Sequence, residues 1–562
     1  MKKLFLSILS LLLISSTGIA QTRTVEHPEY ESSNTESLEI YKVEMKDSET
    51  VLYCDGFGRP TGWIALSSKT YLKGKSGKIY KFLRSEGFEM DKHIFMPASG
   101  TVSFKLHMEA LNKNETSFDF MEGEKPEQFQ IYAIRTYKTK STAPIHCKIK
   151  GEVIDRPESN RLILLKKGED ARVSGKYITI RNGKFEYQLD CTNLEAYELI
   201  FYDESRNGSW RPITFFAESG TVYLKLHPED RFRENVIIGE TKSITNSSKE
   251  LTKRSYKITE NGTLNREWAH YTKLQDSLFN GKAGTQERDR LKKENLLYTD
   301  EAKALIKKLE TAKDNNKVRD SLVSLLNNLQ VSGGLLTPAA IKLEKQSMEM
   351  FNELRKWRTQ YIRQHVSVVS YSLLVDKTSQ ALQQFNEEMP ECIDIFNSIY
   401  AKRYPLHPYT QQMQIKIKSF TSIKVGGSYI DFTAPDFNGK PIKLSEQIQG
   451  KVALIDLWAS WCGPCRRKAK SMIPVYEAYK DKGFTIVGVA REENLSDGVN
   501  AAKMDKYPWL NLIELKDKGK IWEKYGVGNG GGATFLVDRN GVILALDPTD
   551  KEVTAILEKF LK

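Results

Sequence analysis

Cys462 and Cys465 are separated by two residues in the segment LIDLWASWCGPCRRKAK, residues 454–470. An apolar run precedes the pair, and a basic stretch compatible with a helix follows it. A pair with this spacing could be a redox dithiol, half of a metal site, a haem attachment point or a structural disulfide. The neighbouring residues discriminate between these possibilities.

Covalent haem attachment requires a histidine directly after the second cysteine, but Arg466 stands there. A zinc site needs four ligands, and no histidine follows His407 in the sequence. We therefore expect no metal and no cofactor. A purely structural disulfide closing so short a loop would stabilise the fold little, because the entropic benefit grows with loop length.

Redox chemistry suits this spacing. At a strand-to-helix turn, Cys462 would lie at a helix N-terminus, where free backbone N–H groups stabilise a thiolate. Cys465, one turn further along, could then attack a mixed disulfide formed on Cys462. Asp456 precedes Cys462 by six residues within an apolar strand, where burial would raise its pKa and let it take the Cys465 proton. Trp461 and Pro464 would shape the rim and fix the turn.

The elements around the dithiol are predicted to alternate between strands and helices. Residues 451–459 indicate a buried strand, 464–483 a helix, and 484–490 a second buried strand. A helix is expected to begin near residue 500, a hairpin spans 533–547, and an amphipathic helix ends the chain. The first connection must cross over between parallel strands.

The segment LIDLWASWCGPC resembles the active-site strand and turn of thioredoxin. The flanks VGGSYIDFTAPDFNGKPIKLSEQIQGK and ATFLVDRNGVILA are similar to exported thiol:disulfide oxidoreductases of the TlpA/ResA/DsbE type, over residues 424–562. The resemblance implies that Cys462 is the nucleophile, Cys465 the resolving cysteine and Asp456 the buried acid. The implied surroundings of the site are Trp461, Gly463, Pro464, Gly531, Gly532 and Ala533.

Three residues depart from the family pattern. Gly532 stands where the family has a cis-proline beside the dithiol; glycine keeps the backbone available for pairing with substrate but does not lock a cis bond. Lys468 replaces a glutamate common three residues after the second cysteine. Pro474 lies nine residues after that cysteine rather than five, a displacement of about one helical turn.

An internal repeat marks the N-terminal half. FMPASGTVSFKLHME (95–109) matches FFAESGTVYLKLHPE (215–229), and each copy alternates apolar and polar residues as strands do. We expect two β-rich domains, at 25–143 and 144–245; the second resembles the domain of unknown function that precedes such thioredoxin folds in Bacteroidetes-type envelope proteins. His107 and His227 recur in the repeat and are interpreted as strand-end residues, because no second ligand lies nearby.

Helical spacing of leucines follows over residues 250–423, and Thr337 is predicted to cap a helix that starts at Pro338. Glycines and prolines mark a boundary near 424. The expected fold is therefore multidomain: two β-rich N-terminal domains, a helical middle region and a C-terminal α/β thioredoxin fold. Outside the dithiol, Cys54, Cys147, Cys191 and Cys392 are spread along the chain; Cys147 and Cys191 could pair or stay free.

Residues 1–20 are predicted to be a cleavable signal peptide, with two lysines, a short apolar core and small residues at Gly18 and Ala20. The net charge is +12, but the basic residues are spread along the chain and form no dense basic stripe. We therefore expect no nucleic-acid partner. Export points to the periplasm or cell envelope, where disulfides persist.

The leading hypothesis is a periplasmic thiol:disulfide oxidoreductase acting on exported proteins with disulfides. The Gly-Pro dipeptide between the cysteines resembles the reducing thioredoxins and favours reduction. The family resemblance implies a membrane thiol electron donor that reduces the pair again. One alternative is an envelope binding or assembly module in which the dithiol is a sensor or is idle. Another is peroxide reduction, but that activity needs a peroxidatic cysteine in a motif of its own, and WCGPC is not that motif. The oligomeric state is left open.

Overall fold

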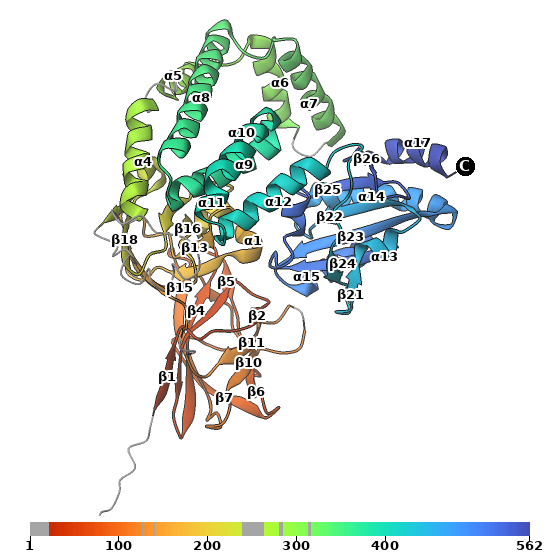
Figure 1. Cartoon of the computed structure of the whole chain (residues 1–562). Coiled ribbons are helices and arrows are strands. Elements are labelled where there is room, and N and C mark those ends of the chain that lie inside the picture. The colour runs from red at the N-terminus through yellow and green to blue at the C-terminus, as the bar shows by residue number, and fades with distance from the viewer. Residues whose placement is uncertain are drawn as a thin grey trace, which may run out of the picture.

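The computed structural model describes residues 22–125, 127–138, 141–238, 264–279, 285–312 and 316–561. The expected signal peptide, residues 1–20, lies outside them. Figure 1 shows a β-rich N-terminal half, a layer of helices above it and an α/β unit at its side. Among the described residues, no helix combines the length and the apolar character needed to cross a membrane.

The first β-rich unit is built on one nine-stranded sheet with the order β1-β3-β4-β9-β7-β6-β10-β11-β2. The sheet has a buried core of its own, to which the fully buried Leu52 and Leu106, paired across β4 and β9, belong. The elements are β1 (Arg23–Glu26), β2 (Ser32–Ser33), β3 (Leu38–Met45), β4 (Glu49–Phe57), β5 (Trp63–Ile64), β6 (Tyr71–Gly74), β7 (Ile79–Glu86), β8 (Ile94–Phe95), β9 (Thr101–Glu109), β10 (Ser117–Met121) and β11 (Gln130–Arg135).

The second β-rich unit has two four-stranded sheets, β15-β12-β18-β19 and β14-β13-β16-β17. Its strands are β12 (Ile145–Val153), β13 (Arg161–Lys166), β14 (Lys176–Thr179), β15 (Lys184–Cys191), β16 (Ala196–Phe201), β17 (Ile213–Phe216), β18 (Gly220–Leu226) and β19 (Val236–Ile238). Its helices are α1 (Ala171–Ser174), α2 (Tyr202–Arg206) and η1 (Glu229–Glu234).

Both copies of the sequence repeat form strands, in sheets of different topology. β9 pairs antiparallel with β4 and β7, whereas β18 pairs parallel with β12. His107 lies within β9 and its Nδ1 is 2.9 Å from Glu49 Oε2; His227 directly follows β18. Cys54, Cys147, Cys191 and Cys392 are buried free thiols, so Cys147 and Cys191 do not pair.

The middle of the chain is helical. Thr337 caps α8 by accepting the Ala340 N–H, and Pro338 occupies the first turn, which confirms the sequence prediction. The helices are α4 (Leu264–Phe279), α5 (Thr285–Lys293), α6 (Asp300–Thr311), α7 (Asn316–Val331), α8 (Pro338–Gln364), α9 (Val368–Gln384), η3 (Asn386–Glu388), α10 (Met389–Ile395), η4 (Phe396–Tyr400), α11 (Ala401–Arg403) and α12 (Pro408–Ser422).

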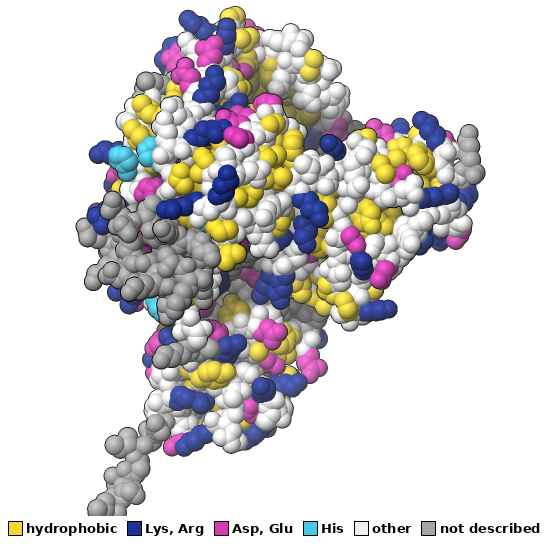
Figure 2. Space-filling model, in the orientation of Figure 1, with side chains coloured by type: hydrophobic (Ala, Val, Ile, Leu, Met, Phe, Trp, Pro, Cys, Tyr) yellow, Lys and Arg dark blue, Asp and Glu magenta, His cyan; other side chains and the backbone are white. Residues whose placement is uncertain are grey.

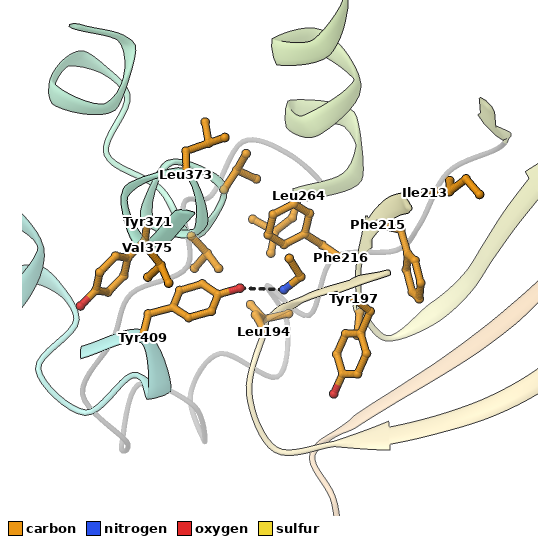
Figure 3. Packing of buried hydrophobic residues seen from close by; sticks show 14 of the residues in the cluster. Leu194, Tyr197, Ile213, Phe215, Phe216, Leu264, Tyr371, Leu373, Val375 and Tyr409 are labelled. Carbon is orange, nitrogen blue, oxygen red and sulfur yellow. Dashed lines mark hydrogen bonds between the residues drawn. The ribbon is translucent and has the colours of Figure 1, made fainter. Parts of the chain in front are cut away.

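The second β-rich unit and the helices share one core. Strands β16 and β17 contribute Tyr197 and Phe215, and helices α9 and α12 contribute Tyr371 and Tyr409 (Figure 3). The Tyr409 hydroxyl accepts the N–H of Ala196 at 2.7 Å, the hydrogen bond drawn in Figure 3. These strands and helices therefore fold against each other as one body.

The C-terminal unit has the five-stranded sheet β24-β23-β22-β25-β26. β22, β23 and β24 are parallel, and β25 and β26 are antiparallel, so the predicted crossover from β22 to β23 is confirmed. The elements are β20 (Thr433–Pro435), β21 (Pro441–Lys443), α13 (Leu444–Ile448), β22 (Val452–Trp458), α14 (Gly463–Tyr479), η5 (Lys480–Lys482), β23 (Phe484–Glu492), α15 (Leu495–Asp505), β24 (Leu510–Leu515), α16 (Ile521–Lys524), β25 (Ala533–Val537), β26 (Ile543–Leu546) and α17 (Asp550–Phe560).

Candidate active site

The turn between β22 and α14 carries both cysteines of the dithiol. β22 is the central strand and its seven residues are all buried, so the strand fixes where the turn emerges. Cys462 is the N-cap of α14, and Cys465 lies in the first turn of the helix. The two form a disulfide with their Cα atoms 5.3 Å apart. The pair therefore lies where a helix N-terminus favours negative charge on the first sulfur.

The turn exposes little of the cysteines themselves. Cys462 is 4% exposed, while Gly463 and Pro464, at the first positions of the helix, are exposed. The backbone N–H of Cys465 lies 3.3 Å from Cys462 Sγ and donates to it. Cys462 is thus the sulfur that the helix N-terminus supports.

Gly532 lies directly against the second sulfur. Its backbone N–H donates to Cys465 Sγ at 3.2 Å, a bond that proline could not make. A Cβ at this position would lie 1.8 Å from the carbonyl oxygen of Leu457. The described residues contain no cis peptide bond. The glycine therefore lets the backbone approach both β22 and the dithiol.

The neighbours of Gly532 complete this side of the site. A Cβ on Gly531 would lie 3.7 Å from Cys462 Sγ, so the two are in contact distance. Ala533 begins β25 and pairs with Leu457 of β22. Residues 531–533 thus run from one sulfur to the central strand.

Asp456 lies on β22 beneath α14. Successive strand residues point to opposite faces, so Asp456 shares its face with Leu454 and Trp458. Leu454 belongs to the buried cluster that includes Met472 of α14, and Trp458 to the one that contacts Cys465. The acid therefore lies between these two clusters, on the face that α14 covers.

Burial raises the pKa of Asp456 from 3.8 to about 7, a trend that the charge of Lys468 opposes and that of Asp547 reinforces. The side chain is 3% exposed. A carboxyl group with this pKa can both hold and release a proton near neutral pH. Lys468, where the family pattern has a glutamate, forms an ion pair with Asp547 at 3.1 Å.

Hydrogen bonds to neighbouring elements hold the β22–α14 turn in place. The Ser460 hydroxyl donates to Glu492 at the end of β23 at 2.9 Å. Arg466 Nε donates to Asp505 of α15 at 2.6 Å. The basic residues after the dithiol are therefore partly paired with carboxylates. Over the face of the molecule that Figure 2 shows, Lys and Arg side chains are likewise scattered among acidic ones.

Residues of the second β-rich unit reach this site, which the sequence did not indicate. The Arg172 guanidinium lies over the Trp461 ring, 3.6 Å from its centroid. Asp170 accepts from Arg491 of β23 at 3.1 Å. Some 290 residues of sequence separate Arg172 from Trp461, and only Trp461 belongs to the dithiol motif, so no local signal could have joined them.

Comparisons with known proteins match the C-terminal unit. The AhpC/TSA family model matches residues 425–546. ResA, a thiol-disulfide oxidoreductase of Bacillus anthracis, is 31% identical over 123 residues, which cover 22% of this chain and 68% of that protein. ResA of Bacillus thuringiensis subsp. konkukian is 28% identical over 140 residues, covering 25% and 78%.

Solved structures match the same part of the chain. The thioredoxin domain of a Bacteroides vulgatus thiol-disulfide oxidoreductase is 30% identical and covers 25% of this chain and 100% of that one, with a TM-score of 0.24. A thiol:disulfide interchange protein from Bacteroides sp. is 31% identical, covers 25% and 91%, and has a TM-score of 0.23. Through its C-terminal unit, the chain belongs to the thioredoxin-fold thiol-disulfide oxidoreductases, redox enzymes of the ResA type.

Proposed function

We propose that the protein reduces or exchanges disulfides of exported proteins in the periplasm through Cys462 and Cys465. The observation that carries this proposal is the position of Cys462 as the N-cap of α14, with Cys465 close enough to close a disulfide with it. Export rests on the predicted signal peptide at residues 1–20.

The reaction begins on Cys462 in the reduced enzyme. Its thiolate attacks one sulfur of the substrate disulfide; an S–S bond forms to Cys462, the substrate bond breaks, and one substrate thiolate leaves and takes up a proton. The substrate remains attached as a mixed disulfide. The helix N-terminus stabilises the attacking thiolate.

Cys465 then completes the reduction. Its sulfur attacks Cys462 Sγ, the enzyme disulfide forms, and the second substrate thiol is released. We assign the proton of Cys465 to Asp456, whose pKa of about 7 suits a general base at neutral pH. The Gly532 N–H donates to Cys465 Sγ and so favours negative charge on that sulfur.

Each turnover moves two electrons from the enzyme dithiol to the substrate. The Cys462–Cys465 disulfide must then be reduced again, and we assign this step to a thiol electron donor of the membrane. Several of the basic side chains after the dithiol pair with carboxylates, as Lys468 does with Asp547, so we assign the choice of the substrate protein to shape rather than to net charge.

Trapping tests the proposal directly. In Cys465→Ser, the mixed disulfide on Cys462 cannot be resolved, so exported proteins should accumulate as adducts in the native envelope. The adducts should be absent from the control Cys462→Ser/Cys465→Ser, and mass spectrometry should place them on Cys462. The absence of adducts, together with failure of the wild-type protein to reduce insulin, would refute the proposal.

The same variants separate this function from an envelope binding module. A binding module predicts that Cys462→Ser keeps the cellular phenotype while deletion of residues 25–245 abolishes it. If the protein acts as an enzyme, Cys462→Ser alone should abolish the phenotype.

A further inference from the structure

We propose that residues 168–172 of the second β-rich unit form one wall of the active-site mouth and restrict the enzyme to disulfides on extended chain segments. We call these residues the wall segment. The inference rests on the proposed function and adds the class of substrate to it. Figure 1 shows α1, which contains Arg172, on the side of the β-rich unit that faces the α/β unit.

Arg172 brings the wall segment to the rim of the dithiol. Its guanidinium lies over the ring of Trp461, 3.6 Å from the centroid, and it also donates to the carbonyl oxygen of Asn529. Asn529 in turn donates to the carbonyl oxygen of Gly168 at 3.3 Å. Both ends of the wall segment therefore contact the loop that leads to Gly532.

Asp170 attaches the wall segment to β23 of the α/β unit. Its carboxylate accepts from Arg491 at 3.1 Å and from Arg172 at 2.8 and 2.9 Å. The side chains of Asp170 and Arg491 are each 4% exposed, and Arg491 is also bound by Asp517. A buried ion pair with several hydrogen bonds holds one geometry, because loss of either partner would leave a buried charge.

The residues that the wall segment contacts, Trp461 and Asn529, lie close to the nucleophile or to its neighbours along the chain. Trp461 is the residue before Cys462, and Gly531, two residues after Asn529, would bring a Cβ within 3.7 Å of Cys462 Sγ. A folded protein that approached Cys462 from this side would meet the wall segment first. The approach to the sulfur is therefore limited by a unit that lies outside the thioredoxin fold.

Two glycines and a proline are exposed on the remaining approach. Gly463, Pro464 and Gly530 are exposed, and a Cβ on Gly530 would meet no heavy atom within 4 Å. Glycine permits close approach of another backbone. An extended segment can thus reach Cys462 Sγ where a convex surface cannot.

A matched pair of substrates tests this selection. One is an unstructured peptide whose single cysteine carries glutathione as a mixed disulfide; the other is the same peptide inserted as a loop into a folded carrier protein. The prereduced full-length enzyme removes glutathione from either by two-electron transfer from its dithiol. We expect the wild-type enzyme to act at least tenfold faster on the free peptide than on the carrier-bound one. In Arg172→Ala, the ratio of these two rates should fall several-fold.

Asp170→Ser provides a second variant, because serine can still cap α1 while the ion pair with Arg491 is lost. Arg231→Ala is the matched control: Arg231 is paired with Asp155 and Glu234 within the second unit, and its removal should leave the ratio unchanged. A wild-type ratio near one, or a ratio that neither Arg172→Ala nor Asp170→Ser narrows, would overturn the proposal.

Alkylation tests the wall without any turnover. In the reduced full-length protein, Cys462 should react with iodoacetamide much faster than with a polyethylene-glycol maleimide, relative to the same reagents on a free cysteine peptide. Arg172→Ala should reduce that size selectivity several-fold, and an unchanged selectivity would refute the wall. Loss of activity on both glutathione substrates would instead refute the proposed function, and alkylation would still decide the inference.

Discussion

Residue types and spacing identify the reacting groups of this protein. Cys462, Cys465 and Asp456 were predicted because each type has chemistry that its sequence position favours: a helix start, a position one turn later, and an apolar strand. The structure places all three around the β22–α14 turn. Arg172 and Asp170 were not predicted, since an arginine in a four-residue helix and the aspartate that caps it carry no chemical signal in the sequence.

Asp456 should make the stability of the protein depend on pH. Its pKa is about 7 in the folded protein and 3.8 when exposed, so between these values the native state holds a proton that the unfolded state has lost. The free energy of unfolding should therefore fall as pH rises from about 4 to 7, by up to about 4 kcal/mol, and level off above. In Asp456→Asn the decline should become smaller by that amount, measured by denaturation of the oxidised protein at pH 4 to 8. Buried glutamates whose pKa is likewise raised to about 7, such as Glu492 and Glu514, should account for what remains.

The same substitution should slow the second chemical step. Without the carboxylate as base, release of reduced substrate from the mixed disulfide should slow by on the order of 100-fold, while attack by Cys462 is spared. Single-turnover kinetics separate the two steps. The control Asp276→Asn changes an exposed residue of α4 and should alter neither stability nor rate. An unchanged resolution rate in Asp456→Asn would remove the acid from the mechanism.

Strands that contain a long apolar run were predictable, and a strand whose run is broken twice was not. β22 and β23 stand out in the sequence because most of their residues are apolar, although β22 contains the buried Asp456. β24 was missed because Asn511 and Glu514 interrupt its apolar run, although both are buried. Glu514 is held there by accepting the Ile521 N–H at 3.0 Å, a contact that no local pattern reveals.

The position of β25 beside β22 requires that residue 532, directly before β25, has no side chain. In Gly532→Ala, the new Cβ would overlap the Leu457 carbonyl oxygen at 1.8 Å, so β25 would have to move away from β22. We expect a loss of at least about 2 kcal/mol in the free energy of unfolding, measured by urea denaturation of the oxidised protein. Gly530→Ala, where a Cβ meets nothing within 4 Å, is the control and should be neutral. Equal stability of the two variants would contradict this packing.

At the scale of the whole molecule, the sequence showed where composition changes but not which segments share a core. The sequence analysis separated a β-rich domain at 144–245 from helices at 250–423. In the structure, Leu199 and Phe215 of the strands lie in one buried cluster with Tyr371 and Met413 of the helices. Contacts between residues some 200 positions apart leave no periodicity in either segment, so a single sequence cannot show them.

Backbone groups of the second β-rich unit also depend on the helical region. His407 Nε2 donates to the Leu194 carbonyl oxygen at 2.9 Å, and Asn265 both accepts from the N–H and donates to the carbonyl oxygen of Phe216 at 2.7 Å. Without the helices these buried polar groups would lose their partners and the apolar face of β16 and β17 would be exposed.

Residues 141–238 should therefore fail to fold when produced alone, whereas 141–423 should fold. We expect the short fragment to bind the dye ANS and to unfold without a cooperative transition, and the longer one to unfold cooperatively in circular dichroism. Residues 22–138 serve as the control, because the first β-rich unit has its own core and should be stable without the helices. Cooperative unfolding of 141–238 would show that the shared core is an interface between two independent units. If residues 141–238 fail to fold alone, the second β-rich unit, which carries the wall segment, unfolds together with the helices. Destabilising mutations in α9 or α12 would then also make the wall segment beside the active site more mobile.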